Sequence, residues 1–296
     1  MLITELERFI EEDLGYDDIS CNIIPDCKVQ AEVVAKEFGI IAGISEATQI
    51  FEYFGILPTT DFLEGDLVKE DDIIFNLDGG ARSILKAERL ALNFLGRMSG
   101  IATLTRQYLE RAAGPRIACT RKTTPGFRKF EKKAVIAGGG DPHRFNLSDA
   151  IMIKDNHIEA IGLEKAIIQA KKAASFTRKI EVEVETADDA IRAAQMGVDI
   201  IMFDNMTVNE IITAVKLLEE KRLKGNVILE ASGGITIENV DKYGVTGVDV
   251  ISIGALTHSC NWLDISLRII PALGQYYSVD NPNAIQSSFE SSTTRI

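Results

Sequence analysis

The sequence predicts an α/β protein with a small α+β domain at its N-terminus, followed by a β/α barrel. Two patterns predict this fold class. Up to about residue 76, short β-like runs are separated by Gly and Asp-Gly, which punctuate strands. Beyond about residue 115, short apolar strands alternate with helical segments, roughly one pair every 20–30 residues, as in parallel βα units.

The first domain is expected to begin with an amphipathic helix over residues 3–13, because Leu6, Phe9 and Ile10 fall on one face. Three β-like runs then follow, at residues 31–35, 39–43 and 72–76. A long helix is expected over residues 83–114, with a break at Ser99-Gly100, since glycine lowers helix stability.

The predicted strands of the second domain are short and apolar: residues 150–153, 180–184, 199–203, 227–230 and 248–253. The predicted helices lie between them, at residues 162–175, 187–196, 208–221 and 237–243. The expected division is therefore 1–114, 115–274 and a tail, 275–296, whose Ser-, Asn-, Thr- and Pro-rich composition predicts disorder. A C-terminal helix near residues 262–275 is expected to pack back on the first domain.

Composition and charge narrow the function classes. No apolar run approaches the roughly 20 residues that cross a bilayer, and the N-terminus lacks a secretory pattern. A net charge of −12 argues against a nucleic-acid binder. The four cysteines form no C-x-x-C pair, so neither a zinc site nor a disulfide framework is expected. Reduced thiols predict a cytoplasmic location.

The basic residues are concentrated in one segment, Thr120–Lys133, which contains six Lys and Arg and the single acid Glu131. A basic pocket in an acidic protein focuses its field on small anions. Arg121-Lys122 precede a turn-forming Pro125-Gly126, so they are not expected to be surface residues of a helix. Residues 128–133 alone could equally be a solvated helix face, so we expect them at most to raise the local potential.

Polar or glycine-rich residues end each predicted barrel strand, where β/α barrels carry their chemistry. These ends are Lys154-Asp155-Asn156-His157, Glu183 and Glu185, Asp204-Asn205, Ser232-Gly233-Gly234 and Ser252-Ile253-Gly254. His143-Arg144 follows a glycine-rich loop and adds to the cations that suit carboxylate or phosphate.

The two acids Glu183 and Asp204 could share Mg²⁺ with substrate phosphate, or could form salt bridges to nearby lysines. Glu181, Glu183 and Glu185 alternate with valines and should point to one side of their strand. The two glycine-bearing turns could bind phosphate through backbone N–H groups. The residues alone therefore predict a site for a carboxylate ligand and a phosphorylated, metal-bound partner.

Eight segments, read together, are more specific than any single motif: residues 88–95, 99–106, 120–126, 153–158, 181–185, 202–205, 230–236 and 247–258. They resemble the quinolinate phosphoribosyltransferases, the carboxylating nicotinate-nucleotide pyrophosphorylases. The resemblance runs in order from about residue 3 to 270, and Thr120–Gly126 and Lys154–His157 are its most specific parts.

The resemblance implies an N-terminal α/β sandwich and an incomplete, open β/α barrel. It implies a cytoplasmic enzyme of NAD biosynthesis that converts quinolinate and phosphoribosyl pyrophosphate to nicotinate mononucleotide, pyrophosphate and CO₂, with Mg²⁺. It also implies a homodimer, or an assembly of dimers, with active sites at the subunit interface.

Residue roles are also implied by the resemblance. Quinolinate would be held by Arg121, His143, Arg144, Lys154 and, from the neighbouring subunit, Arg89. Lys122, Glu183 and Asp204 would be catalytic and would serve phosphoribosyl pyrophosphate, the two acids through the metal. The remaining substrate contacts would be Thr120, Ser232, Gly233, Gly234, Ser252, Ile253 and Gly254.

The chain departs from the family pattern at three places. Cys119 stands where an acid is usual, Pro142 stands where an Asn commonly precedes the histidine, and Gly15–Ser20 has an altered spacing. Pro142 would stiffen the approach to His143 and so affect the pose of that ring.

Two alternative functions follow from the same resemblance. One is a relative that acts on another pyridine carboxylate such as nicotinate, which has one carboxylate; the five candidate cations favour a dicarboxylate. The other is a molybdate-transport-associated relative that binds without catalysing, and the retained Lys154–His157 segment argues against it.

Overall fold

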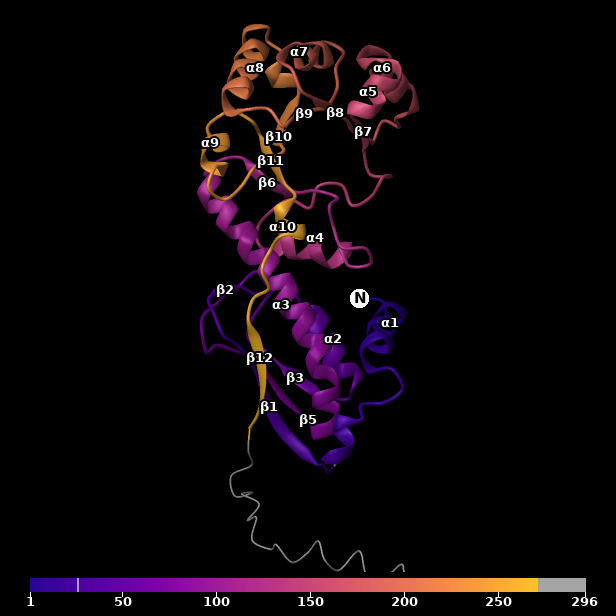
Figure 1. Ribbon diagram of the computed structural model, residues 1–296, viewed down its shortest axis with the longest axis vertical. Coiled ribbons are helices and arrows are strands. Elements are labelled where there is room, and N and C mark those ends of the chain that lie inside the picture. Colours follow the sequence, from indigo (N-terminus) through magenta and orange to yellow (C-terminus); the bar gives the residue numbers. More distant parts are fainter. Residues whose placement is uncertain (26, 271–296) are drawn as a thin grey trace, which may run out of the picture.

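The computed structural model describes residues 1–25 and 27–270 and consists of two parts connected by one long helix, α3 (Ala81–Ala112) (Figure 1). The first part is an antiparallel sheet of strand order β12-β1-β5-β3. Its strands are β1 (Lys28–Ala35), β3 (Leu57–Thr59), β5 (Ile73–Gly80) and β12 (Ile265–Ile270). Helices α1 (Ile3–Leu14), α2 (Ile44–Tyr53) and the first half of α3 accompany it, which gives the expected two-layer arrangement.

Three short elements complete this part: η1 (Ser20–Ile23), β2 (Gly39–Ile40) and β4 (Leu67–Val68). Strand β1 buries its C-terminal half, including Val33 and Val34. The amphipathic spacing predicted for the first helix is confirmed, with Leu6 and Ile10 buried.

The second part is a parallel sheet of strand order β6-β11-β10-β9-β8-β7. Its strands are β6 (Arg116–Cys119), β7 (Ile151–Ile153), β8 (Ile180–Val184), β9 (Ile200–Asp204), β10 (Ile228–Ser232) and β11 (Val250–Ile253). Within the described residues the edge strands β6 and β7 do not pair, so the barrel is open, as expected.

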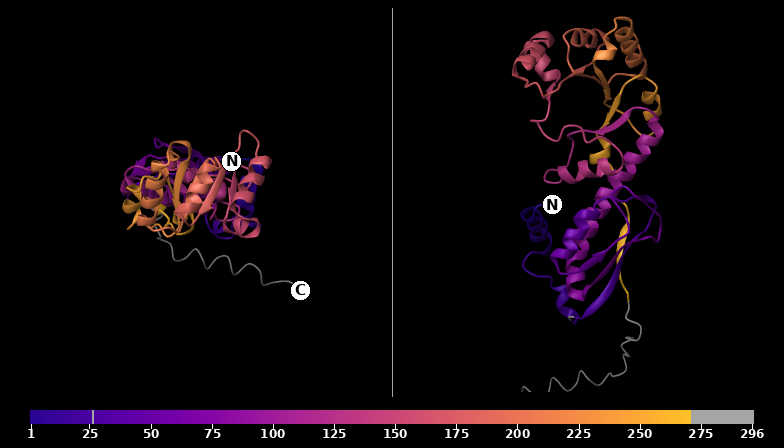
Figure 2. Two further views of the ribbon diagram at one scale, coloured as in Figure 1. Left: turned by 90° about the horizontal axis from the view of Figure 1, so that it is seen from above. Right: turned by 180° about the vertical axis from the view of Figure 1, so that it is seen from behind.

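The connecting helices are α4 (Arg128–Ala137), α5 (Asp155–Ile161), α6 (Leu163–Ala173), α7 (Ala187–Gln195), α8 (Val208–Glu220), α9 (Val240–Gly244) and α10 (Ala255–His258), with η2 (Lys224–Asn226) before β10. Figure 2 shows α6, α7 and α8 on the outside of the arc of strands. Thr186 caps α7, and Thr207 forms a capping box with Glu210 on α8, so both helices begin where the sequence satisfies their first N–H groups. The sequence prediction missed β6 and α5.

The predicted break at Ser99-Gly100 is wrong, because α3 continues through both residues. Both residues are buried, and each contacts a segment from elsewhere in the chain. A Cβ on Gly100 would lie 2.0 Å from the Asn261 carbonyl oxygen, so this glycine admits a crossing segment. The Ser99 hydroxyl accepts the Ala42 N–H at 2.9 Å. The small residues therefore mark a packing site and not a helix end.

The predicted C-terminal helix near residues 262–275 is also wrong within the described residues. Residues 265–270 form β12, which pairs antiparallel with β1 from Ala35–Ile265 to Gln30–Ile270. The expectation that this segment packs on the first part holds, because β12 is an edge strand of its sheet. The proposed tail, 275–296, lies outside the described residues, within which no helix is long and apolar enough to cross a membrane.

Candidate active site

The C-terminal ends of β7 to β11 surround a pocket of about 680 Å³. It brings together fourteen of the fifteen residues predicted to bind substrate: Thr120, Arg121, Lys122, His143, Arg144, Lys154, Glu183, Asp204, Ser232, Gly233, Gly234, Ser252, Ile253 and Gly254. Arg89 is the exception, since it is exposed on α3 and does not line this pocket. The parallel sheet causes the convergence, because its strands all end at one edge.

Two glycine-bearing turns form one side of the pocket. Gly233 has a φ of +92°, and a Cβ there would lie 2.2 Å from Asn205 Oδ1, so no larger residue fits. Asn205 itself is left-handed, with φ +54°. On the next strand, the Ser252 hydroxyl is buried without a hydrogen-bond partner. Backbone N–H groups and an unpartnered hydroxyl at adjacent strand ends can bind phosphate oxygens.

The Thr120–Lys122 loop supplies cations that have no acidic partner among the described residues. The Thr120 hydroxyl accepts the Lys122 N–H at 3.1 Å, and the Thr257 hydroxyl donates to the Lys122 carbonyl at 2.7 Å. Arg121 Nε is buried and unpartnered. A buried guanidinium nitrogen without an acceptor favours an anionic ligand.

His143 has a left-handed backbone, φ +51°, and its ring lies between two buried carboxylates. Nε2 is 3.4 Å from Glu230 Oε2 and 3.7 Å from Glu181 Oε1. Nδ1 accepts the Arg144 N–H at 2.7 Å. Both ring nitrogens therefore have protein partners, and this pose does not direct them at a ligand, although His143 lines the pocket.

The charge of the His143 ring depends on its two acidic neighbours, Glu181 and Glu230. Burial alone would lower the pKa of His143, but Glu181 and Glu230 raise it to about 10. Burial raises the pKa of Glu181, and the nearby Glu230 adds to that shift. A doubly protonated ring could no longer accept the Arg144 N–H at Nδ1. The positive charge that the two carboxylates favour therefore competes with the hydrogen bond from Arg144. In either state Nε2 carries the proton that the carboxylates attract.

Alternation predicted that Glu181, Glu183 and Glu185 share one side of the strand, but β8 ends at Val184 and Glu185 lies beyond it, exposed. Glu181 is fully buried, Glu183 lines the pocket, and Glu185 lies outside it. Lys154 Nζ pairs with Glu183 Oε1, the salt bridge that the sequence left open beside a metal site. Asp204 accepts only from Asn205 Nδ2, at 3.0 Å, among the described hydrogen bonds. An Asp204 without a cationic partner beside Glu183 suits a divalent cation that also binds phosphate.

The interpretation of residues 128–133 as a solvated helix face holds for Lys129, which is exposed, and is wrong for Glu131 and Lys132. Residues 128–133 lie in α4, where Glu131 and Lys132 are fully buried. The helix also contacts α3, which the sequence did not indicate.

His258 was missed by sequence reasoning as a pocket residue. It follows Gly254 by four positions on α10, and a Cβ on Gly254 would lie 3.0 Å from His258 Nε2. The signal was present, because a histidine one helical turn after a strand-end glycine points back at that turn.

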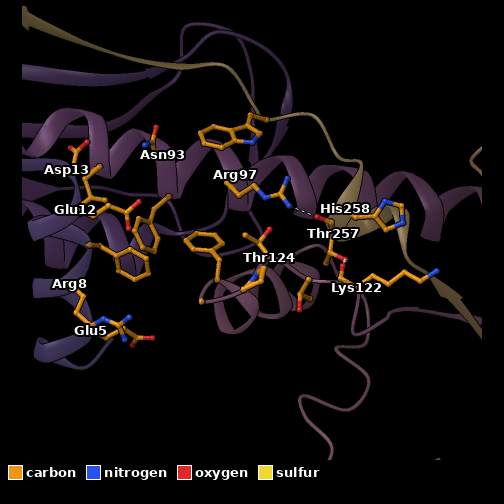
Figure 3. Close-up of a pocket in the computed structure, with 18 of the residues that line it drawn as sticks. Glu5, Arg8, Glu12, Asp13, Asn93, Arg97, Lys122, Thr124, Thr257 and His258 are labelled. Carbon is orange, nitrogen blue, oxygen red and sulfur yellow. Dashed lines mark hydrogen bonds between the residues drawn. The ribbon is translucent and has the colours of Figure 1, made fainter.

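A second pocket of about 1050 Å³ lies between α1, α3 and the Arg121–Phe127 segment. Figure 3 shows Glu5, Glu12 and Asp13 of α1 at one end of this pocket, Lys122 and His258 at the other, and Arg97 between them. The two pockets share Arg121, Lys122 and His258, so the cationic loop is a wall between them.

Comparison with protein families gives two matches that together span most of the chain. Residues 17–99 match the quinolinate phosphoribosyl transferase N-terminal domain, and residues 101–268 match the C-terminal domain of the same family.

Similar proteins agree with these matches. A "probable nicotinate-nucleotide pyrophosphorylase [carboxylating]" of Methanothermobacter thermautotrophicus is 45% identical over 89% of this chain and 97% of its own length. The human nicotinate-nucleotide pyrophosphorylase [carboxylating] is 38% identical over 81% of this chain and 82% of its own. The crystal structure of NadC from Streptococcus pyogenes has a TM-score of 0.85 at 40% identity, covering 90% of this chain and 96% of that one.

Proposed function

The chain belongs to the quinolinate phosphoribosyltransferase family, and from this premise we infer that the pocket at the barrel strand ends is its active site. The reaction transfers the phosphoribosyl group of phosphoribosyl pyrophosphate to quinolinate, with loss of pyrophosphate and CO₂, and yields nicotinate mononucleotide for NAD biosynthesis. The observation that carries the assignment is the convergence of cations, acids and glycine turns in one pocket.

Quinolinate would occupy the cationic side of the pocket, where Arg121, Arg144 and Lys154 converge. A ligand with two neighbouring carboxylates suits several cations, and planar guanidinium groups can bind each carboxylate with two hydrogen bonds. His143 would support Arg144 and not bind quinolinate directly, since its ring nitrogens contact Glu181, Glu230 and the Arg144 N–H.

Phosphoribosyl pyrophosphate would lie across the opposite side. Its phosphate suits the Gly233 and Ser252 turns, and Lys122 suits the pyrophosphate. Glu183 and Asp204 fit Mg²⁺, because Asp204 has no cationic partner among the described residues and both acids face the same space. When bound, Mg²⁺ would neutralise charge on the departing pyrophosphate.

In the reaction, the bond between the ribose carbon and pyrophosphate breaks with its electrons on oxygen. The sugar becomes cationic, and Glu183 and Asp204 stabilise it electrostatically. The pyridine nitrogen donates its lone pair to that carbon. The resulting pyridinium accepts the electron pair of the breaking C–C bond when the adjacent carboxylate leaves as CO₂, and a proton replaces it. The protein positions the reactants and needs no side-chain nucleophile.

A shared active site would explain the position of Arg89. This exposed residue of α3 lies outside the pocket of its own chain, and the cationic loop is open to the larger pocket beside it. In a homodimer, or an assembly of dimers, Arg89 would enter the neighbouring subunit's site and add a cation for quinolinate.

A cytoplasmic location is supported by the four free cysteine thiols.

The test is to incubate the purified protein with Mg²⁺, phosphoribosyl pyrophosphate and quinolinate labelled in the carboxylate next to the ring nitrogen. We expect release of labelled CO₂ together with an equal amount of nicotinate mononucleotide. Turnover of nicotinate alone, or tight binding of phosphate esters without turnover, would contradict the proposal.

A further inference from the structure

Three consecutive residues of α4, Glu131, Lys132 and Lys133, bind three different parts of the molecule. Each makes a contact with a segment distant in the sequence. Glu131 and Lys132 are fully buried, and the partner of Lys133, Glu46, is fully buried too. Buried charged groups are costly unless hydrogen-bonded, so these contacts require a structural or functional reason.

Glu131 holds the Thr120–Pro125 loop. Its carboxylate accepts the Thr124 N–H at 3.0 Å and the Thr124 hydroxyl at 2.9 Å. It also accepts from Arg97 Nη2 at 2.6 Å.

Arg97 extends this contact to the other side of the loop. It donates to the Thr257 carbonyl (dashed in Figure 3). The Thr257 hydroxyl in turn donates to the Lys122 carbonyl. Glu131 and Arg97 therefore fix the Thr120–Pro125 loop at Thr124 directly and at Lys122 through Thr257.

Lys132 holds the second cationic loop. Its Nζ donates to the Pro142 carbonyl and lies 3.5 Å from Cys119 Sγ. The Cys119 thiol also donates to the Pro142 carbonyl, at 3.2 Å. Burial lowers the pKa of Lys132 and raises the pKa of the Cys119 thiol, so this contact does not depend on an ion pair. The fixed carbonyl immediately precedes His143 and Arg144.

Lys133 supplies a matched comparison. It pairs with Glu46 of α2, on the side of the first domain, and touches neither cationic loop. Breaking this pair disturbs the same helix through a buried carboxylate and leaves the pocket contacts in place.

We propose that Glu131 and Lys132 are positioning residues that set the two cationic loops of the pocket, Glu131 for Arg121 and Lys122, and Lys132 for His143 and Arg144. The proposal rests on the proposed function for its kinetic consequences. Neither residue lines the pocket, so each acts through the loop that it holds.

The kinetic test compares Glu131→Gln and Lys132→Met with the control Glu46→Gln. Lys132→Met should raise KM for quinolinate about tenfold and leave KM for phosphoribosyl pyrophosphate within about twofold. Glu131→Gln should lower kcat/KM for both substrates by about 10- to 100-fold, because its loop carries a contact to each. Thr124→Val, an exposed change that removes only the hydroxyl contact, should reproduce part of this loss if Glu131→Gln folds poorly.

Hydrogen–deuterium exchange gives a readout that does not depend on activity. Glu131→Gln should speed exchange in residues 120–125 alone, Lys132→Met in residues 140–145 alone, and Glu46→Gln in neither. If all three variants share one kinetic and exchange pattern, the proposal is wrong. A wild-type protein without turnover but with loop-specific exchange would overturn the proposed function and leave the positioning roles supported.

Discussion

The two halves of the basic run, Thr120–Lys122 and Arg128–Lys133, look alike in sequence and differ in structure. In the first half, Arg121 and Lys122 have no acidic partner among the described residues and line both pockets. In the second, Lys129 pairs with Glu5, Lys133 pairs with Glu46, and Lys132 is buried. Charge density therefore does not identify a binding site. Within this run, the two cations that line the strand-end pocket are ones without an acidic partner among the described residues.

The largest expected difference between the halves is in catalysis. Arg121→Ala should lower kcat/KM by about 1000-fold, because it removes a charged contact to a substrate carboxylate in the pocket. Lys129→Ala should change kcat/KM by less than about twofold, since its pair with Glu5 lies away from the strand ends. Steady-state assays of both variants test this contrast, and equal losses would break it.

Subunit mixing sharpens the account of which site Arg121 serves. Arg89→Ala and Arg121→Ala proteins should each be nearly inactive, but after subunit exchange they should recover about a quarter of wild-type activity, because half of the dimers then have one intact site. The measurement requires proof of exchange, for example by mass spectrometry of differently tagged subunits. Exchanged dimers with no activity would contradict a shared site.

Stability should show the reverse contrast. Phe130→Ala should lower the free energy of unfolding by about 3–5 kcal/mol, because this buried ring packs on Phe9, Phe94 and Phe127 at centroid distances of 4.9–5.8 Å. Arg121→Ala should change it by less than about 0.5 kcal/mol. Urea denaturation of the two variants tests this, and a large loss for Arg121→Ala would mean that the loop is structural.

A smaller effect concerns pH. Against burial, Glu181 and Glu230 raise the pKa of His143 to about 10, so the folded protein keeps a proton that the unfolded chain loses above its ordinary pKa of 6.5. This contribution to stability is full below pH 6.5 and is lost as pH rises to about 10. Denaturation of wild type and His143→Gln across that range should show the slope only in wild type; parallel curves would indicate a neutral ring.

Sequence reasoning located the pocket because it depends on a local rule. Lys154, Glu183, Asp204, Ser232 and Ser252 all end parallel strands, and such ends meet at one edge. The ion-pair partners of the charged residues of α4 could not be predicted in the same way. Lys129 and Glu5 are 124 positions apart, and Lys133 and Glu46 are 87 apart, so no local pattern connects them.

The two corrected elements have the same origin. Gly100 lowers helix propensity, but its missing Cβ lets the Asn261–Trp262 segment cross α3, and this packing outweighs the local cost. Residues 265–270 form a strand because β1 offers an unpaired edge. The pose of the His143 ring likewise depends on Glu230, which belongs to a different strand.

The most direct test of the contrast between the two halves is a crystal structure of the protein with quinolinate bound. We predict that the two carboxylates contact Arg121, Arg144 and Lys154 at the strand ends, while Lys132 keeps its contact with Pro142 and Lys133 its contact with Glu46. Quinolinate bound to any lysine of α4, or seated in the larger pocket between α1 and α3 without contact to Arg144, would contradict the account.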